Sequence, residues 1–125
     1  MQRVLIAEDD PDTANAIKAT LEGRLGVIAD HVTNGALVFD QIASLRPDVL
    51  ILDVSLPGLN GVDVFDLIRG SDRWDGPILF LTATPERARR AFARKGIREI
   101  MQKPFELDVL TQRVSDLLAR APRAA

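Results

Sequence analysis

The chain has 125 residues, of which 46% are hydrophobic, and a formal net charge of −2, which fits one globular domain with a core of its own. It contains no cysteine and one histidine, which excludes disulfide frameworks, thiolate chemistry and multi-histidine metal centres. No apolar run is long enough to span a membrane and no signal peptide is recognisable at the N-terminus, so we expect a soluble protein of the cytoplasm.

Strand-like and helix-like segments alternate along the chain. Strands are expected near 3–7, 27–32, 48–52, 77–82 and 97–101, and helices near 11–23, 35–45, 62–70, 85–95 and 106–120. This alternation predicts βα units and a parallel sheet. The first, third and fourth strands are continuously apolar, as in strands covered on both faces, whereas the second and fifth carry charges, as edge strands do. The sequence therefore predicts a doubly wound α/β fold with strand order 2-1-3-4-5.

Polar residues stand at the C-terminal ends of four predicted strands. In chain order they are Glu8-Asp9-Asp10, Asp53, Thr82 and Lys103. The ends of parallel strands meet at one edge of a sheet, and ligands bind where the strand order reverses, here between the first and third strands. An acidic cluster alone is often only a solvated helix N-terminus. Carboxylates gathered at one edge need a neutralising cation, and a hard cation suits a phosphoryl group.

Five short segments around these residues resemble the receiver domain of two-component response regulators. They are Val-Leu-Ile-Ala-Glu-Asp-Asp at 4–10, Pro-Asp-Val-Leu-Ile-Leu-Asp at 47–53, Leu-Pro-Gly-Leu-Asn-Gly at 56–61, Leu-Thr-Ala at 81–83 and Lys-Pro-Phe at 103–105. The resemblance implies a flavodoxin-like (βα)5 fold with a five-stranded sheet. We expect a receiver domain over 1–121, with 122–125 as a frayed tail or the start of a linker.

The resemblance implies a signalling phospho-acceptor, not a conventional enzyme. Asp53 would take a phosphoryl group from a histidine kinase or a histidine phosphotransfer protein and form an aspartyl phosphate. Lys103 would pair with Asp53 and then with the phosphoryl group, whose other oxygens would bind the Thr82 hydroxyl and the Ala83 backbone N–H. Such a domain promotes its own phosphorylation and dephosphorylation. It passes the signal to an output domain or a downstream protein by a population shift between two conformers.

The resemblance also implies Mg²⁺ as the cofactor. Asp9 and Asp53 would bind the ion through their side chains, and Ser55 through its backbone carbonyl. Glu8 would act through a coordinated water. Asp10 is expected to be an N-terminal helix charge instead of a ligand.

The chain departs from the family at Ile100. Most receivers carry Tyr or Phe at this position, three residues before the lysine, and that ring swings inward as the threonine closes on the phosphoryl group. A pseudo-receiver that docks partners without phosphorylation is therefore an alternative. A Mg²⁺-dependent phosphohydrolase is disfavoured, because the position of its acid–base aspartate is Ser55. In receivers the positions that Ser55 and Thr84 occupy flank the phosphoryl group. We therefore expect these two residues to set the lifetime of the aspartyl phosphate.

A basic segment covers residues 86–98. It holds one acidic residue and six basic ones: Arg87, Arg89, Arg90, Arg94, Lys95 and Arg98. A solvated face, a docking surface for an acidic partner or output domain, and contact with nucleic acid are the three interpretations. We do not expect the last, since no recognition helix or base-stacking platform accompanies the segment. A Glu99–Arg113 pair on the face of the fourth helix, fifth strand and fifth helix is compatible with a homodimer.

Overall fold

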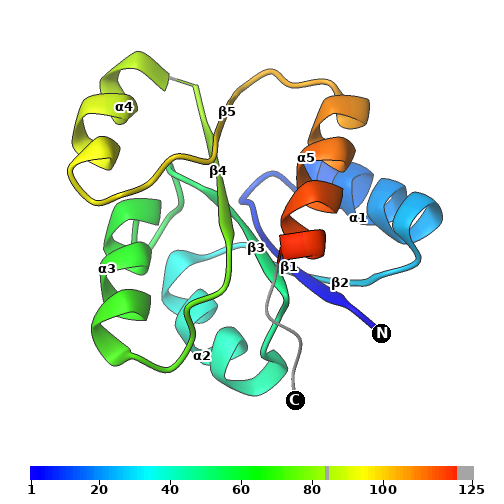
Figure 1. The fold of residues 1–125 in the computed structure, drawn as a ribbon, viewed down its shortest axis with the longest axis horizontal. Helices are drawn as coiled ribbons and strands as arrows, with labels where there is room; N and C mark the ends of the chain where they lie inside the picture. Colours follow the sequence, from blue (N-terminus) through cyan, green and yellow to red (C-terminus); the bar gives the residue numbers. More distant parts are fainter. Residues whose placement is uncertain (84, 121–125) are drawn as a thin grey trace.

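A computed structural model describes residues 1–83 and 85–120 of the chain. Strands and helices alternate through these residues in the order β1 (Arg3–Ala7), α1 (Pro11–Leu25), β2 (Ile28–Val32), α2 (Gly35–Leu45), β3 (Val49–Asp53), α3 (Gly61–Ser71), β4 (Ile78–Thr82), α4 (Pro85–Ala93), β5 (Ile100–Gln102) and α5 (Leu107–Arg120). All paired strands are parallel, in the order β2-β1-β3-β4-β5 (Figure 1). The predicted doubly wound, flavodoxin-like fold is confirmed.

Two apolar layers enclose the sheet. Alternate residues of a strand point to opposite faces, so Ile6 of β1 packs in the layer beneath α1 and α5, and Leu5 packs in the layer beneath α2, α3 and α4. The helices lie on the two faces in the same division (Figure 1). Every residue of β3 and β4 is buried, which explains their continuous apolar sequences. No helix among the described residues is long and apolar enough to cross a membrane.

Local signals fix the helices that begin near the sheet edge. Asp10 caps α1, its carboxylate accepting a hydrogen bond from the Thr13 backbone N–H at 3.2 Å, and Pro11 takes the first helical position. Gly61 begins α3 directly against the end of β3. A Cβ atom at Gly61 would lie 2.8 Å from the Asp53 carbonyl oxygen, so only glycine allows α3 to start this close to Asp53.

The end of α4 and the start of β5 differ from the prediction. The helix ends at Ala93 and not near 95, and the strand begins at Ile100 and not at Ile97. The backbone N–H groups of Lys95 and Ile97 both donate to the Phe92 carbonyl, at 2.9 and 3.0 Å, and so the chain turns after the helix. Ile97 is buried because it packs in the apolar layer under α3 and α4. An apolar residue at this position resembles a strand residue in the sequence, although it lies before β5.

Candidate functional site

Three of the predicted side chains lie buried at the C-terminal edge of the sheet. Asp53 is the last residue of β3, Thr82 is the last residue of β4, and Glu8 follows β1. The exposed fractions of the whole residues are 3% for Asp53, 3% for Thr82 and 1% for Glu8. A buried carboxylate is costly unless it is paired, so two of them at one edge require a cation.

Lys103 supplies that cation. Its Nζ atom lies 2.8 Å from Glu8 Oε2 and 2.8 Å from Asp53 Oδ2. The lysine backbone N–H donates to the Thr82 carbonyl at 2.8 Å, which fixes the segment after β5 against β4. One ammonium group is therefore shared by two carboxylates from different strands.

The second oxygen of each carboxylate is held by the backbone. Asp53 Oδ1 accepts a hydrogen bond from the Ser55 N–H at 3.0 Å, and Glu8 Oε1 accepts one from the Asp10 N–H at 3.2 Å. Both carboxylates are thus oriented by one backbone donor and one shared ammonium. These donors fix the orientation of both carboxylate groups.

His31 was not among the predicted site residues, yet its ring contacts the backbone of Glu8. Its Nε2 atom lies 2.9 Å from the Glu8 carbonyl oxygen, and the Glu8 N–H donates to the Val32 carbonyl at 3.1 Å. The end of β1 is therefore anchored to β2 by both backbone groups of Glu8. The signal lay in the strand order: His31 pairs with Ile6 in the β1–β2 register, so its ring can reach the residue that follows β1.

Asp9 joins the two buried carboxylates on the solvent side. Glu8, Asp9 and Asp53 each place a carboxylate oxygen within 4.8 Å of the others. Three carboxylates beside the single positive charge of Lys103 leave an excess of negative charge, and a set of oxygen donors suits a hard divalent cation such as Mg²⁺. Asp10 is not in this group and caps α1, as predicted.

The pKa shifts follow from burial and from the shared lysine. Burial raises the pKa of Glu8 above its usual range, Asp53 adds to this increase, and the hydrogen bond from Lys103 opposes it. Burial lowers the pKa of Lys103, but its hydrogen bonds to Asp53 and Glu8 outweigh that effect, so that the pKa is raised overall. Lys103 therefore remains protonated while it bridges the two acids.

The other predicted positions lie around this cluster. Ser55 is exposed next to Asp53. Ala83 and Lys103 line a cavity of about 520 Å³ together with residues of α1 and of the segment before α5. Ile100 is half-buried and packs against the apolar layer under α3 and α4. Thr84 lies outside the described residues, as do residues 122–125.

The basic segment presents exposed arginines, among them Arg94 and Arg98; the side chain of Arg87 lies outside the described part of the chain. The predicted Glu99–Arg113 pair exists within the chain, at 3.0 Å, and Arg120 binds the second Glu99 oxygen at 3.0 Å. Hydrogen bonds from Arg120 and Arg113 lower the pKa of Glu99. This carboxylate is therefore satisfied without a second copy of the chain.

Comparison with known proteins gives a consistent result. Residues 4–115 match the family described as response regulator receiver domain. The chain is 32% identical over 120 residues to the DNA-binding response regulator MtrA of Mycolicibacterium smegmatis, and 36% identical over 119 residues to the response regulator MprA of Mycobacterium tuberculosis. These alignments cover 95% and 94% of this chain but 51% of each relative, so the chain spans about half the length of the curated relatives that it matches.

A solved structure agrees with the sequence matches. A response regulator from Chloroflexus aurantiacus superposes with a TM-score of 0.86 at 34% identity, covering 95% of this chain and 98% of that one. Fold and sequence therefore point to the same family.

Proposed function

The chain belongs to the response regulator receiver domain family, and we propose that Asp53 accepts a phosphoryl group from a histidine kinase or a histidine phosphotransfer protein. Receiver domains are signalling modules, and the activity proposed here is phosphoryl acceptance, not turnover of a substrate. The observation that carries the proposal is the position of Lys103. Its ammonium group lies 2.8 Å from the carboxylates of both Asp53 and Glu8, beside the place where phosphoryl charge would develop.

In the proposed transfer an Asp53 carboxylate oxygen attacks phosphorus. The new O–P bond forms as the N–P bond to the donor imidazole breaks, and the imidazole leaves with the electron pair. Lys103 then pairs with a phosphoryl oxygen, and the Thr82 hydroxyl and the Ala83 backbone N–H bind the others. Phosphoryl transfer needs positioning and charge neutralisation more than a general base, which agrees with a site made of one acceptor, one ammonium and hydrogen-bond donors.

Mg²⁺ is part of the proposal. Asp9 and Asp53 would hold the ion through their carboxylates, Ser55 through its backbone carbonyl, and Glu8 through a coordinated water. When bound, the ion would neutralise charge on the transferring phosphoryl oxygens. Three carboxylate oxygens within 4.8 Å of one another, and one ammonium to balance them, support this assignment.

The proposed output follows from the relatives. MtrA is described as a DNA-binding response regulator and is about twice as long as this chain. We propose that phosphorylation at Asp53 shifts the population of conformers and changes contacts with an output domain or a downstream protein in the cytoplasm. Homodimer formation remains a prediction.

A phosphorylation-independent docking module is the second candidate, and Ile100 favours it. In receivers the aromatic ring at this position moves inward when the threonine closes on the phosphoryl group. An aliphatic residue has no polar-tipped ring that could make the same movement when Thr82 closes. The complete set of Asp53, Lys103 and Glu8 favours phosphorylation. Titration with Mg²⁺, followed by backbone amide signals, separates the two: saturable shifts around Asp9 and Asp53 support the receiver, and unchanged signals at millimolar Mg²⁺ support the docking module.

Phosphoramidate provides a direct test, because its P–N bond resembles that of a phosphohistidine. The protein is incubated with this donor and Mg²⁺, and protein-bound phosphorus is followed by ³¹P NMR. We expect one acyl phosphate signal in the wild type, none in Asp53→Asn, and an unchanged signal in Asp63→Asn, an exposed aspartate in the first turn of α3. Labelling of Asp53→Asn, or none in a folded wild type, would contradict the proposal.

A further inference from the structure

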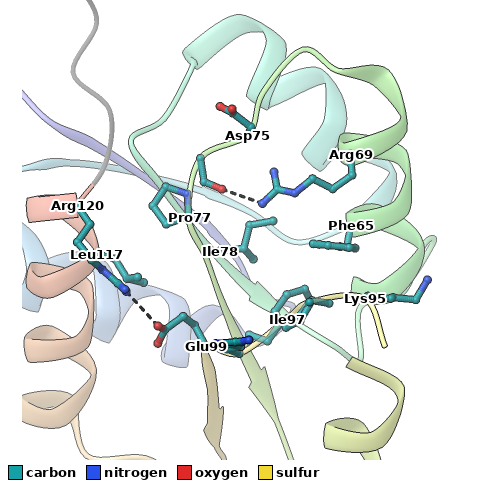
Figure 2. A pocket seen from close by; sticks show the side chains of 14 residues that line it. Phe65, Arg69, Asp75, Pro77, Ile78, Lys95, Ile97, Glu99, Leu117 and Arg120 are labelled. Carbon is teal, nitrogen blue, oxygen red and sulfur yellow. Dashed lines mark hydrogen bonds and ion pairs between the residues drawn. The ribbon is translucent and has the colours of Figure 1, made fainter. Parts of the chain in front are cut away.

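A cavity of about 430 Å³ lies at the edge of the sheet where β4 begins, near the opposite end of that strand from Thr82 (Figure 2). It exists because β5 starts late. Pairing between β4 and β5 begins at Phe80 and Ile100, where the Phe80 N–H donates to the Glu99 carbonyl at 2.9 Å, and residues 96–98 precede that pairing. Side chains from α3, from this segment and from α5 surround the resulting space, among them Phe65, Arg69, Ile97, Arg98 and Leu117.

Part of the cavity wall is apolar. Ile78, Ile97 and Leu117 have exposed fractions of 6%, 8% and 2%, so these side chains are fixed by the core and offer only part of their surface. Phe65 adds an aromatic ring from α3 (Figure 2). A ligand that contains one apolar ring could bury that ring against these side chains. Removing this apolar surface from water would favour binding.

Arg69 is held in place beside this apolar space. Its guanidinium donates to the Trp74 carbonyl at 3.2 Å and to the Gly76 carbonyl at 3.0 Å. It also stacks over Phe65, with Cζ 5.2 Å from the ring centroid. A guanidinium has five N–H donors, so two carbonyl acceptors leave donors for an anion.

The charges around the cavity favour an anion. Lys95 pairs with Asp66 and Arg120 pairs with Glu99, each within 3.0 Å. Within the described ranges, Arg69 and Arg98 have no ion pair with a carboxylate, although Asp75 lies on the same rim. Arg69 and Arg98 together carry two positive charges and Asp75 carries one negative charge, so the net charge of the rim is positive.

We propose that this cavity binds a small organic acid, with the apolar body against Ile78 and Leu117 and the carboxylate directed to Arg69 and Arg98. The cavity volume falls in the range of about 300–1,000 Å³ that is usual for small-molecule sites. This supports a free small molecule as the occupant. The site does not depend on phosphorylation, so Asp53→Asn should bind the acid as the wild type does.

The test uses 3-phenylpropionate and its uncharged amide, 3-phenylpropionamide. Binding is followed by backbone amide shifts at Ile78, Ile97 and Leu117, and by the fluorescence of Trp74, the only tryptophan, whose ring lies 5.9 Å from Arg69 Cζ. We expect saturable binding of the acid with a Kd on the order of 1 mM. The amide, which lacks the charge, should bind about tenfold more weakly.

Variants locate the carboxylate. Arg98→Gln and Arg69→Gln should each weaken binding of the acid about tenfold, and Arg24→Gln, which removes an exposed arginine of α1 that pairs with Asp108, should leave it unchanged. Because Arg69 also braces Trp74, Arg98→Gln decides the test if Arg69→Gln fails to fold. Absence of saturation, equal binding of the acid and the amide, or shifts confined to Ala83 and Lys103 would overturn the proposal.

Discussion

Lys103 Nζ lies 2.8 Å from Asp53 Oδ2, although 50 positions separate the two residues in the chain. The same nitrogen lies 2.8 Å from Glu8 Oε2, and the carboxylate side chains of Glu8 and Asp53 are only 1% and 4% exposed. Removing one partner of a buried pair is costly because the other charge stays buried and unpaired. Lys103 is therefore both a structural cation and, in the proposed function, a phosphoryl ligand.

Replacing Lys103 by Gln should lower the free energy of unfolding by about 2–3 kcal/mol at neutral pH, since two buried carboxylates lose their cation. Lys95→Gln is the matched control. It breaks the Lys95–Asp66 pair, whose side chains are 35% and 51% exposed, and should cost less than about 1 kcal/mol. Urea unfolding measures both variants, and equal losses would contradict the structural role of Lys103.

The Glu8 side chain should titrate at a pH above 4.5, the ordinary pKa of a glutamate, because burial raises its pKa. The folded chain then binds the proton more tightly than the unfolded chain. The stability contributed by this group is fully present below the ordinary value and is lost as the pH rises through the folded pKa. ¹³C NMR of the side-chain carboxyl carbons measures the titration directly.

Glu99 serves as the internal control in the same spectra, because hydrogen bonds from Arg120 and Arg113 lower its pKa. In Lys103→Gln the pKa of Glu8 should rise further, since the hydrogen bond that lowers it is gone. A Glu8 titration at or below that of Glu99 would show that burial does not control the protonation of Glu8.

Two glycines of α3 should respond in opposite ways to alanine. A Cβ atom added at Gly70 would meet nothing within 4 Å, so Gly70→Ala should stabilise the helix by about 0.5–1 kcal/mol. At Gly61 the added Cβ would lie 2.8 Å from the Asp53 carbonyl oxygen. Gly61→Ala should therefore destabilise the fold and slow phosphorylation of Asp53. Thermal unfolding and the phosphoramidate assay test both effects, and a stable, fully active Gly61→Ala protein would contradict the packing.

Phe92 should be the main anchor of α4. Its side chain is 1% exposed, and its ring centroid lies 4.9 Å from that of Phe80 in β4. Phe92→Ala should cost about 3–5 kcal/mol, while Val109→Ala on the exposed side of α5 should stay within about 0.5 kcal/mol. Denaturant unfolding gives both values, and a loss below about 1 kcal/mol at Phe92 would mean that other contacts hold α4.

The strand order was predictable because burial differs between central and edge strands. Val49–Asp53 and Ile78–Thr82 are buried throughout and therefore read as continuous apolar runs, whereas β2 and β5 carry charged or polar residues at the edges. Once the order was set, the gathering of Glu8, Asp53 and Lys103 at one edge followed from the geometry of parallel strands.

The start of β5 and several side-chain contacts could not be predicted. Ile97 is apolar because it packs under α3 and α4, and a short apolar run does not reveal whether packing or strand pairing buries it. Arg69 bonds to backbone carbonyls and Arg120 to a residue 21 positions away. Such contacts depend on where loops place their carbonyl groups and on the conformations of long arginine side chains. Neither of these leaves a periodic signal in the sequence.

Intact-mass spectrometry after incubation with a small phosphodonor decides whether Asp53 is the phosphoryl acceptor. The wild type and Asp53→Asn are compared in Mg²⁺ and in excess chelator. We expect a mass increase of one phosphoryl group in the wild type with Mg²⁺, and none in Asp53→Asn or in the chelator. The same increase in a folded Asp53→Asn protein, or its absence from a folded wild type with Mg²⁺, would contradict the assignment of Asp53 as the phosphoryl acceptor.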